Sequence, residues 1–122
     1  MIVGRLAVVL TGLMLLGCPP GAQQTPEAEF VQVDIRNSAF VPRDITIQVG
    51  QTVRWTNEDP VFHTITSGNP GDPDAGILFD SHDLIPFDSF RHTFNQAGVF
   101  VYHSKLDIGR PGMVGATVTV TE

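Results

Sequence analysis

Residues 45–57 read ITIQVGQTVRWTN, and this stretch decides how the 122-residue sequence is expected to fold. In its first half every second residue is apolar, and after a VGQ break the alternation resumes at Val53 and Trp55. A period of two places alternate side chains on opposite faces of an extended chain, as in a strand with one buried face. The stretch therefore predicts two β-strands separated by a turn.

The same alternation recurs on both sides of this stretch. It is found in four further runs, at 31–35, 90–94, 99–101 and 114–120. Segments rich in Gly, Pro, Asn and Asp separate the runs, and no stretch of ten residues carries a helical apolar stripe free of Gly and Pro. About seven to eight short strands in a chain of this length predict an all-β fold, a β-sandwich.

The overall composition limits the classes of function. The sequence is 42% hydrophobic and 16% charged, with a net charge of −6. This balance favours one globular domain over a disordered chain. Nucleic acid is not expected as a partner, because binding to phosphates rewards a basic surface.

Residues 1–17 are predicted to be a lipoprotein signal peptide. Arg5 supplies a positive charge, and the apolar run at 6–16 is too short to span a bilayer comfortably. The run ends in LLGC, which resembles the lipobox of bacterial lipoproteins and implies cleavage before Cys18 and a diacylglycerol on its sulfur. The alternative is an ordinary signal peptide followed by an incidental cysteine. Cys18 is the only cysteine, so a disulfide framework is excluded.

The next segment, residues 18–28, is predicted to be a flexible tether. It contains PPGAQQTP at 19–26, with three prolines and no periodic apolar pattern. The folded domain is expected to cover residues 29–122. The protein is thus predicted to lie in the cell envelope, on the periplasmic or outer face, and to be held at a membrane by the lipid on Cys18.

Histidines are the candidates for chemistry, since the sequence has no glycine-rich phosphate loop, no CxxC motif and no recognisable Ser-His-Asp spacing. A histidine in a small β protein is more often structural than a metal ligand. One candidate metal site on the surface combines His82 with His92 and with Asp80 or Asp83. The full set of histidines is His63, His82, His92 and His103.

A series of short motifs follows in a fixed order along the domain. VRWTNED at 53–59 and HTI at 63–65 come first, and they are followed by FDS at 79–81, FRHTF at 90–94, GVFVY at 98–102 and GMVGATV at 112–118. Together the motifs resemble the cupredoxin family, in particular plastocyanin and amicyanin, over most of residues 30–122. The resemblance implies a Greek-key β-sandwich whose first copper ligand is His63.

The ligand loop departs from that family's pattern. In the family it reads YHCxxH followed by a methionine, whereas here it reads YHSKLD at 102–107, with Met113 further on. The resemblance implies that His63 and Met113 match ligands, that Ser104 stands at the position of the cysteine and that Asp107 stands at the position of the second histidine. A blue copper site needs two histidines, a cysteine thiolate and a weak axial methionine. This chain is therefore not expected to form a blue copper centre.

The remaining donors predict a remodelled metal site. His63 offers an imidazole, Asp107 a carboxylate and Met113 a thioether. An imidazole with a carboxylate favours a divalent ion, and copper(II) heads the usual affinity order. His103 is a less favoured ligand, because neighbouring residues of a strand point to opposite faces and Ser104 would then be the one that faces the site.

Three functions remain open from the sequence. The first is a copper-binding cupredoxin with a non-blue site and an electron-transfer or copper-handling role. Its partner would be a redox or copper-handling protein. The second is a metal-free cupredoxin fold that acts as a binding or assembly module in the envelope. The third is an enzyme that uses His63 and Asp107 as an acid/base pair; since no other feature supports it, the chain is predicted not to be an enzyme.

The lipobox resemblance makes a prediction about location. Cys18→Ser removes the sulfur that would carry the lipid, so we expect the variant to be released from the membrane fraction or mislocalised. Membrane and soluble fractions of cells expressing each protein would be compared by immunoblot. A variant that partitions into membranes like the unmodified chain would contradict the lipid anchor.

Overall fold

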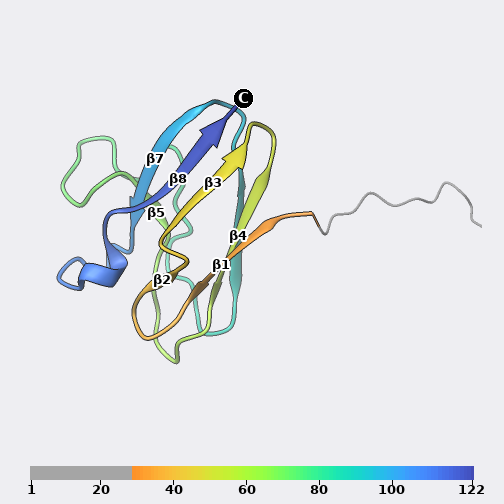
Figure 1. The fold of residues 1–122 in the computed structure, drawn as a ribbon. Coiled ribbons are helices and arrows are strands. Elements are labelled where there is room, and N and C mark those ends of the chain that lie inside the picture. Colours follow the sequence, from red (N-terminus) through yellow and green to blue (C-terminus); the bar gives the residue numbers. More distant parts are fainter. Residues whose placement is uncertain (1–28) are drawn as a thin grey trace, which may run out of the picture.

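The computed structural model describes residues 29–122, so the predicted signal peptide, Cys18 and the tether at 18–28 lie outside the described residues. Within 29–122 the chain forms two packed four-stranded sheets (Figure 1), which confirms the all-β sandwich. No helix in this part of the chain is long and apolar enough to cross a membrane.

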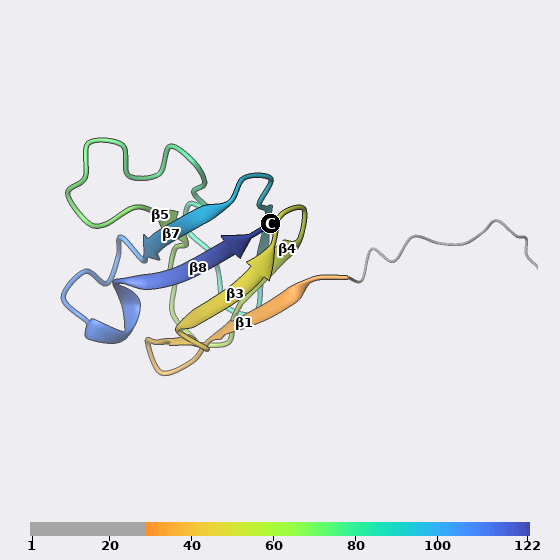
Figure 2. The same ribbon diagram turned by 45° about the horizontal axis from the view of Figure 1, so that its top comes forward.

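The first sheet has the strand order β2-β1-β4-β6, with the bounds Phe40–Val41, Val31–Ile35, Thr52–Asn57 and Ser89–Thr93. The second sheet has the order β3-β8-β7-β5, with the bounds Asp44–Gln48, Ala116–Thr121, Gly98–His103 and Thr66–Ser67. A single turn of 3-10 helix, η2 (Pro111–Met113), lies before β8. Figure 2 shows β3, β8 and β7 side by side in one layer, with β1 in the other.

The register of β1 and β4 determines which loops meet. These two strands are parallel, with Val31 opposite Val53 and Ile35 opposite Asn57. Because both strands end at the same edge, the turn after β1 and the loop after β4 come together at one end of the sandwich. The described chain begins at the opposite end, beside the start of β4.

The core consists largely of residues that the alternation predicted. In β4, Val53, Trp55 and Asn57 are buried and the residues between them are half-buried. The Trp55 ring centroid lies 5.5 Å from that of Tyr102 and 5.8 Å from that of Phe79. Burial of such large apolar side chains contributes on the order of 1.5–3 kcal/mol each. The predominantly apolar interior therefore stabilises the packing of the two sheets.

Some strand boundaries differ from the sequence prediction. The strands β2 and β5 have two residues each, which is too short for an alternation to be recognised. The run expected at 114–120 becomes a strand only from Ala116, because Gly115 has a φ of 75° and interrupts the extended backbone.

The close packing of Gly112 gives a stability prediction. A Cβ added there would lie 2.8 Å from the Ala39 Cβ and 2.8 Å from the Ser38 carbonyl oxygen. We expect Gly112→Ala to lower the free energy of unfolding by about 1–3 kcal/mol in urea titrations, the usual cost of overpacking. Gly109→Ala is the matched control, since a Cβ there meets nothing within 4 Å. Equal losses in both variants would contradict the role given to Gly112.

Candidate metal site

Asn57, the last residue of β4, fixes the loop that follows the strand. Its side-chain Nδ2 donates to the carbonyls of Val61 at 2.8 Å and Leu84 at 2.9 Å, and its Oδ1 accepts the amide N–H of Asp59 at 3.0 Å. All three bonds are made by one fully buried side chain. The loop after β4 therefore has a defined path before it reaches His63.

Asp59 connects this loop to the turn after β1. The amides of Asn37 and Ser38 donate to its carboxylate at 2.7 and 2.8 Å, and both residues have positive φ angles, of 52° and 54°. Burial by itself would raise the pKa of Asp59, but the hydrogen bonds from Ser38, His63 and Asn37 outweigh it, and the pKa lies below its ordinary value of 3.8. Asp59 is thus an ionised, well-held carboxylate beside the ring of His63.

The imidazole of His63 is fully buried and lies between two carboxylates. Its Nε2 is 2.8 Å from Oδ2 of Asp59, and its Nδ1 is 2.7 Å from Oδ2 of Asp107. A neutral imidazole carries only one N–H. Satisfying both contacts therefore requires one further proton or cation, held between the ring and a carboxylate.

Ser104 completes the cluster from the end of β7. Its hydroxyl donates to Oδ2 of Asp107 at 2.6 Å and accepts the amide N–H of Thr64 at 3.0 Å. Its own amide donates to the carbonyl of Met113 at 2.9 Å. Ser104 is fully buried, so its hydroxyl faces the cluster and not the solvent.

The ligand loop is compact despite its length. Successive backbone hydrogen bonds run from the amide of Asp107 to the carbonyl of Ser104, from Arg110 to Asp107 and from Met113 to Arg110. These turns bring the carboxylate of Asp107 back to His63. The Asp107 side chain is 13% exposed, whereas His63 and Ser104 are fully buried. The Asp59 side chain is 10% exposed, so solvent reaches the cluster at both of its carboxylates.

The structure thus brings His63, Ser104 and Asp107 into direct contact. Met113 lies beside them through its main chain, while its fully buried side chain belongs to the hydrophobic core. His103 is directed elsewhere: its Nδ1 lies 2.7 Å from the carbonyl oxygen of Gly68. This is the direction that strand alternation implied for the neighbour of Ser104.

The alternative site at His82 is not assembled. His82 is 81% exposed, and its Nδ1 lies 4.0 Å from Asp80, whose carboxylate is bound instead by Nζ of Lys105 at 2.9 Å. The half-buried ring of His92 packs against the core residue Phe79, with centroids 4.8 Å apart. Partial burial lowers the pKa of His92 below its ordinary value of 6.5.

Asp59 is the site residue that the sequence reasoning did not identify as functional. The available signal was its position, four residues before His63 and two after Asn57. The contacts of its carboxylate with the turn after β1 depend on the parallel pairing of β1 and β4, which alternation does not reveal.

The chemistry of the donors decides which metal ion could fit. Within residues 29–122 there is no group of three or more His, Cys, Asp or Glu side chains that could hold a metal. Asp59 and Asp107 contact opposite nitrogens of one ring, so they cannot share an ion with it. On the Nδ1 side the donors are an imidazole, a carboxylate and a hydroxyl. This set fits an ion that prefers nitrogen and oxygen, such as copper(II), and not a thiolate-bound blue copper centre.

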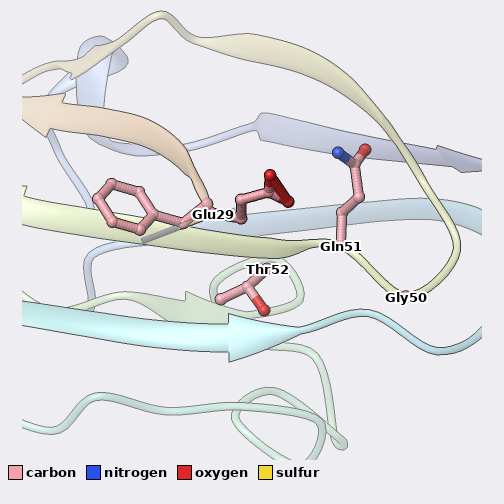
Figure 3. A pocket seen from close by; sticks show the side chains of 5 residues that line it. Glu29, Gly50, Gln51 and Thr52 are labelled. Atoms are coloured by element: carbon pink, nitrogen blue, oxygen red, sulfur yellow. The ribbon is translucent and has the colours of Figure 1, made fainter. Parts of the chain in front are cut away.

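A hollow of about 510 Å³ lies at the other end of the sandwich, where the described chain begins. It is lined by Glu29, Phe30, Gly50, Gln51 and Thr52 (Figure 3). The guanidinium of Arg54 lies over the ring of Phe30, with its Cζ atom 4.3 Å from the ring centroid. With one carboxylate and no histidine or sulfur, this hollow offers no comparable set of metal donors.

The ion pair of Asp80 with Lys105 connects the long loop after β5 to the ligand loop. Burial by itself would raise the pKa of Asp80, but the hydrogen bond from Lys105, the amide of His82 and the charge of Lys105 hold it below its ordinary value of 3.8. A carboxyl group with a lowered folded-state pKa stabilises the fold above its unfolded-state pKa. This contribution is lost as the pH falls through the folded-state value.

We therefore expect Asp80→Asn to lower the free energy of unfolding by about 1–2 kcal/mol at pH 7, the usual cost of losing charged hydrogen bonds. The difference from the unmodified chain should shrink below about pH 4, because Asp80 is then protonated first in the unfolded chain and, at lower pH, in the folded chain as well. Urea titrations at pH 7 and pH 3 would measure both effects, with the exposed Asp83→Asn as control. A difference that grows at low pH would contradict this account.

Comparison with known proteins places this geometry in a family. No protein-family model matches the sequence. A solved purple cupredoxin from Nitrosopumilus maritimus is 34% identical, over 75% of this chain and 99% of that protein, with a TM-score of 0.63. The Cu(I) form of an amicyanin variant is 26% identical, over 75% of this chain and 82% of that one, with a TM-score of 0.60.

A copper-containing nitrite reductase from Thermus scotoductus is also similar, at 27% identity and a TM-score of 0.60. The match covers 76% of this chain but only 22% of the reductase, so it concerns one part of that larger protein. The identity to the purple cupredoxin extends over nearly all of that protein, and it agrees with the β-sandwich fold. This chain belongs to the cupredoxin family.

Proposed function

We propose that this protein binds copper(II) in the cell envelope, at a non-blue site centred on Nδ1 of His63. The observation that carries the proposal is the arrangement of the two ring nitrogens. Asp59 holds Nε2, which leaves Nδ1 directed at the carboxylate of Asp107 and near the hydroxyl of Ser104. Structures of similar proteins contain copper, namely amicyanin and the nitrite reductase.

Each residue of the cluster has a distinct role in this proposal. His63 and Asp107 are the ligands, and Ser104 orients the carboxylate through its 2.6 Å hydrogen bond or donates its own oxygen. Asp59 fixes the orientation of the imidazole and keeps the ring proton on Nε2. Carboxylates next to metal-bound histidines commonly have this role. Met113 can add a weak thioether contact only if its side chain turns out of the core. Copper, when bound, would supply a one-electron redox centre.

Binding requires a small movement of the two ligands. Ligand atoms about 2.0–2.2 Å from one ion are separated from each other by roughly 3 Å, whereas Nδ1 of His63 and Oδ2 of Asp107 are 2.7 Å apart. The carboxylate would move outward by a few tenths of an ångström. The Asp107 carboxylate lies on a loop at the solvent boundary, so it can move more readily than the buried imidazole of His63.

We further propose that a copper-handling or redox protein docks over Asp107. Three large apolar side chains next to the ligands in sequence are exposed: Phe62 by 49%, Leu106 by 51% and Ile108 by 59%. Apolar residues around a functional opening are typical of protein contact surfaces. A lipid tether joined at residue 29 would enter at the opposite end of the sandwich, so this surface would be directed away from the point of attachment.

A metal-free binding module is the second candidate, and one observation favours it. The carboxylates of Asp59 and Asp107 already occupy both nitrogens of His63, so a proton could replace the metal as the bridging cation. An enzyme that uses His63 and Asp107 as an acid/base pair is disfavoured, because a fully buried imidazole has no room beside it for a substrate.

Copper titration separates these candidates. The full chain carrying Cys18→Ser, which has no thiol, is expected to bind one copper(II) without the intense visible band of a copper–thiolate bond. His63→Ala should weaken binding at least tenfold, about 1.4 kcal/mol, and the exposed His82→Ala should leave it unchanged. Calorimetry and absorption spectroscopy would measure both, with circular dichroism to confirm folding. Absence of copper binding would support the metal-free module. Weaker binding in His82→Ala alone would place the copper site at His82 and not at His63.

A further inference from the structure

We infer that the residues around His63 discriminate between the two oxidation states of copper, binding copper(II) and releasing the metal once it is reduced to copper(I). The inference rests on the proposed copper(II) site and adds to it the direction in which the site exchanges its metal. The protein would then be a copper carrier that releases its metal on reduction, and not a carrier of electrons.

The first argument is the chemical softness of the donors. Soft thiolate and thioether ligands select copper(I), while imidazole and carboxylate groups suit divalent ions. The groups on the Nδ1 side of His63 are the Asp107 carboxylate and the Ser104 hydroxyl, both of which are hard oxygen donors. The one soft atom nearby is the sulfur of Met113, whose side chain is fully buried in the hydrophobic core.

The second argument is charge. Two carboxylates contact the His63 ring, at 2.7 and 2.8 Å. The neighbouring cation, Lys105, is paired with Asp80 at 2.9 Å. Coulomb attraction to a fixed negative charge is twice as large for a dication as for a monocation at the same distance, and burial strengthens it. Reduction of the metal therefore removes half of the attraction that helps to hold it.

The chemistry of release balances with an external reductant such as ascorbate. One ascorbate gives two electrons and is oxidised to dehydroascorbate, two copper(II) ions become copper(I), and protons are released to water. No protein group changes its oxidation state. Each tenfold preference for copper(II) over copper(I) lowers the reduction potential of the bound metal by about 59 mV relative to the free ion.

Two affinities test the inference in the full chain carrying Cys18→Ser. Copper(II) would be titrated against glycine as a competing ligand. Copper(I), kept reduced by ascorbate without oxygen, would be titrated against bicinchoninate. We expect copper(II) to bind at least about tenfold more tightly than copper(I). Asp107→Asn should weaken copper(II) binding at least about tenfold and copper(I) binding by less than about threefold.

A near-isosteric substitution should shift the preference toward copper(I). Adding Ser104→Cys to the chain that carries only Cys18→Ser places a thiolate at the cluster, and it should raise copper(I) affinity at least about tenfold. The same addition at an exposed position of β6 at the other end of the sandwich, Thr93→Cys, should not. Equal or tighter binding of copper(I) by the chain with Ser104 would overturn the inference while leaving the copper site intact. Failure to bind either ion would overturn both the inference and the proposed function.

Discussion

The contact of the buried His63 imidazole with two carboxylates is the interaction on which this end of the molecule depends. Asp59 joins the ring to the turn after β1, and Asp107 joins it to the loop between β7 and β8. Three segments that are distant in sequence are thereby held around one side chain. A buried polar cluster of this kind is stable only when its members satisfy one another, because an unpaired buried group is costly.

In the proposed function, this cluster takes the place that the resemblance assigns to the family's ligand set. Ser104 is fully buried and donates a hydrogen bond to Asp107. Asp107 brings a carboxylate to the imidazole of His63. In our proposal this pair of imidazole and carboxylate binds a cation through nitrogen and oxygen donors. Either a proton or a divalent ion can complete the pair, and the two proposed functions differ in which one does.

The scaffold also places the cluster where it can exchange with its surroundings. The parallel register of β1 and β4 sets the cluster at one end of the sandwich and the start of the described chain at the other. The carboxylates of Asp107 and Asp59 are both partly exposed, and the exposed side chains of Phe62, Leu106 and Ile108 neighbour the proposed ligands in sequence. The ligand most able to move is therefore also the one beside the apolar surface proposed for a partner.

The sequence by itself determined the strands whose alternation is long enough to be seen, such as β4 with Val53 and Trp55. The resemblance of the ligand loop also predicted that no blue copper centre forms, because it implies Ser104 and Asp107 at the positions of the cysteine and the second histidine. Strand alternation predicted that His103 points away from the side on which Ser104 lies, and in the structure the His103 ring contacts the carbonyl of Gly68. The two-residue strands β2 and β5, and the interruption at Gly115, carry no pattern of their own. The tertiary structure alone decided that Asp59 and Asp107 flank His63. Their meeting depends on strand register and on the turns of a compact loop, and both result from long-range packing that local periodicity does not encode.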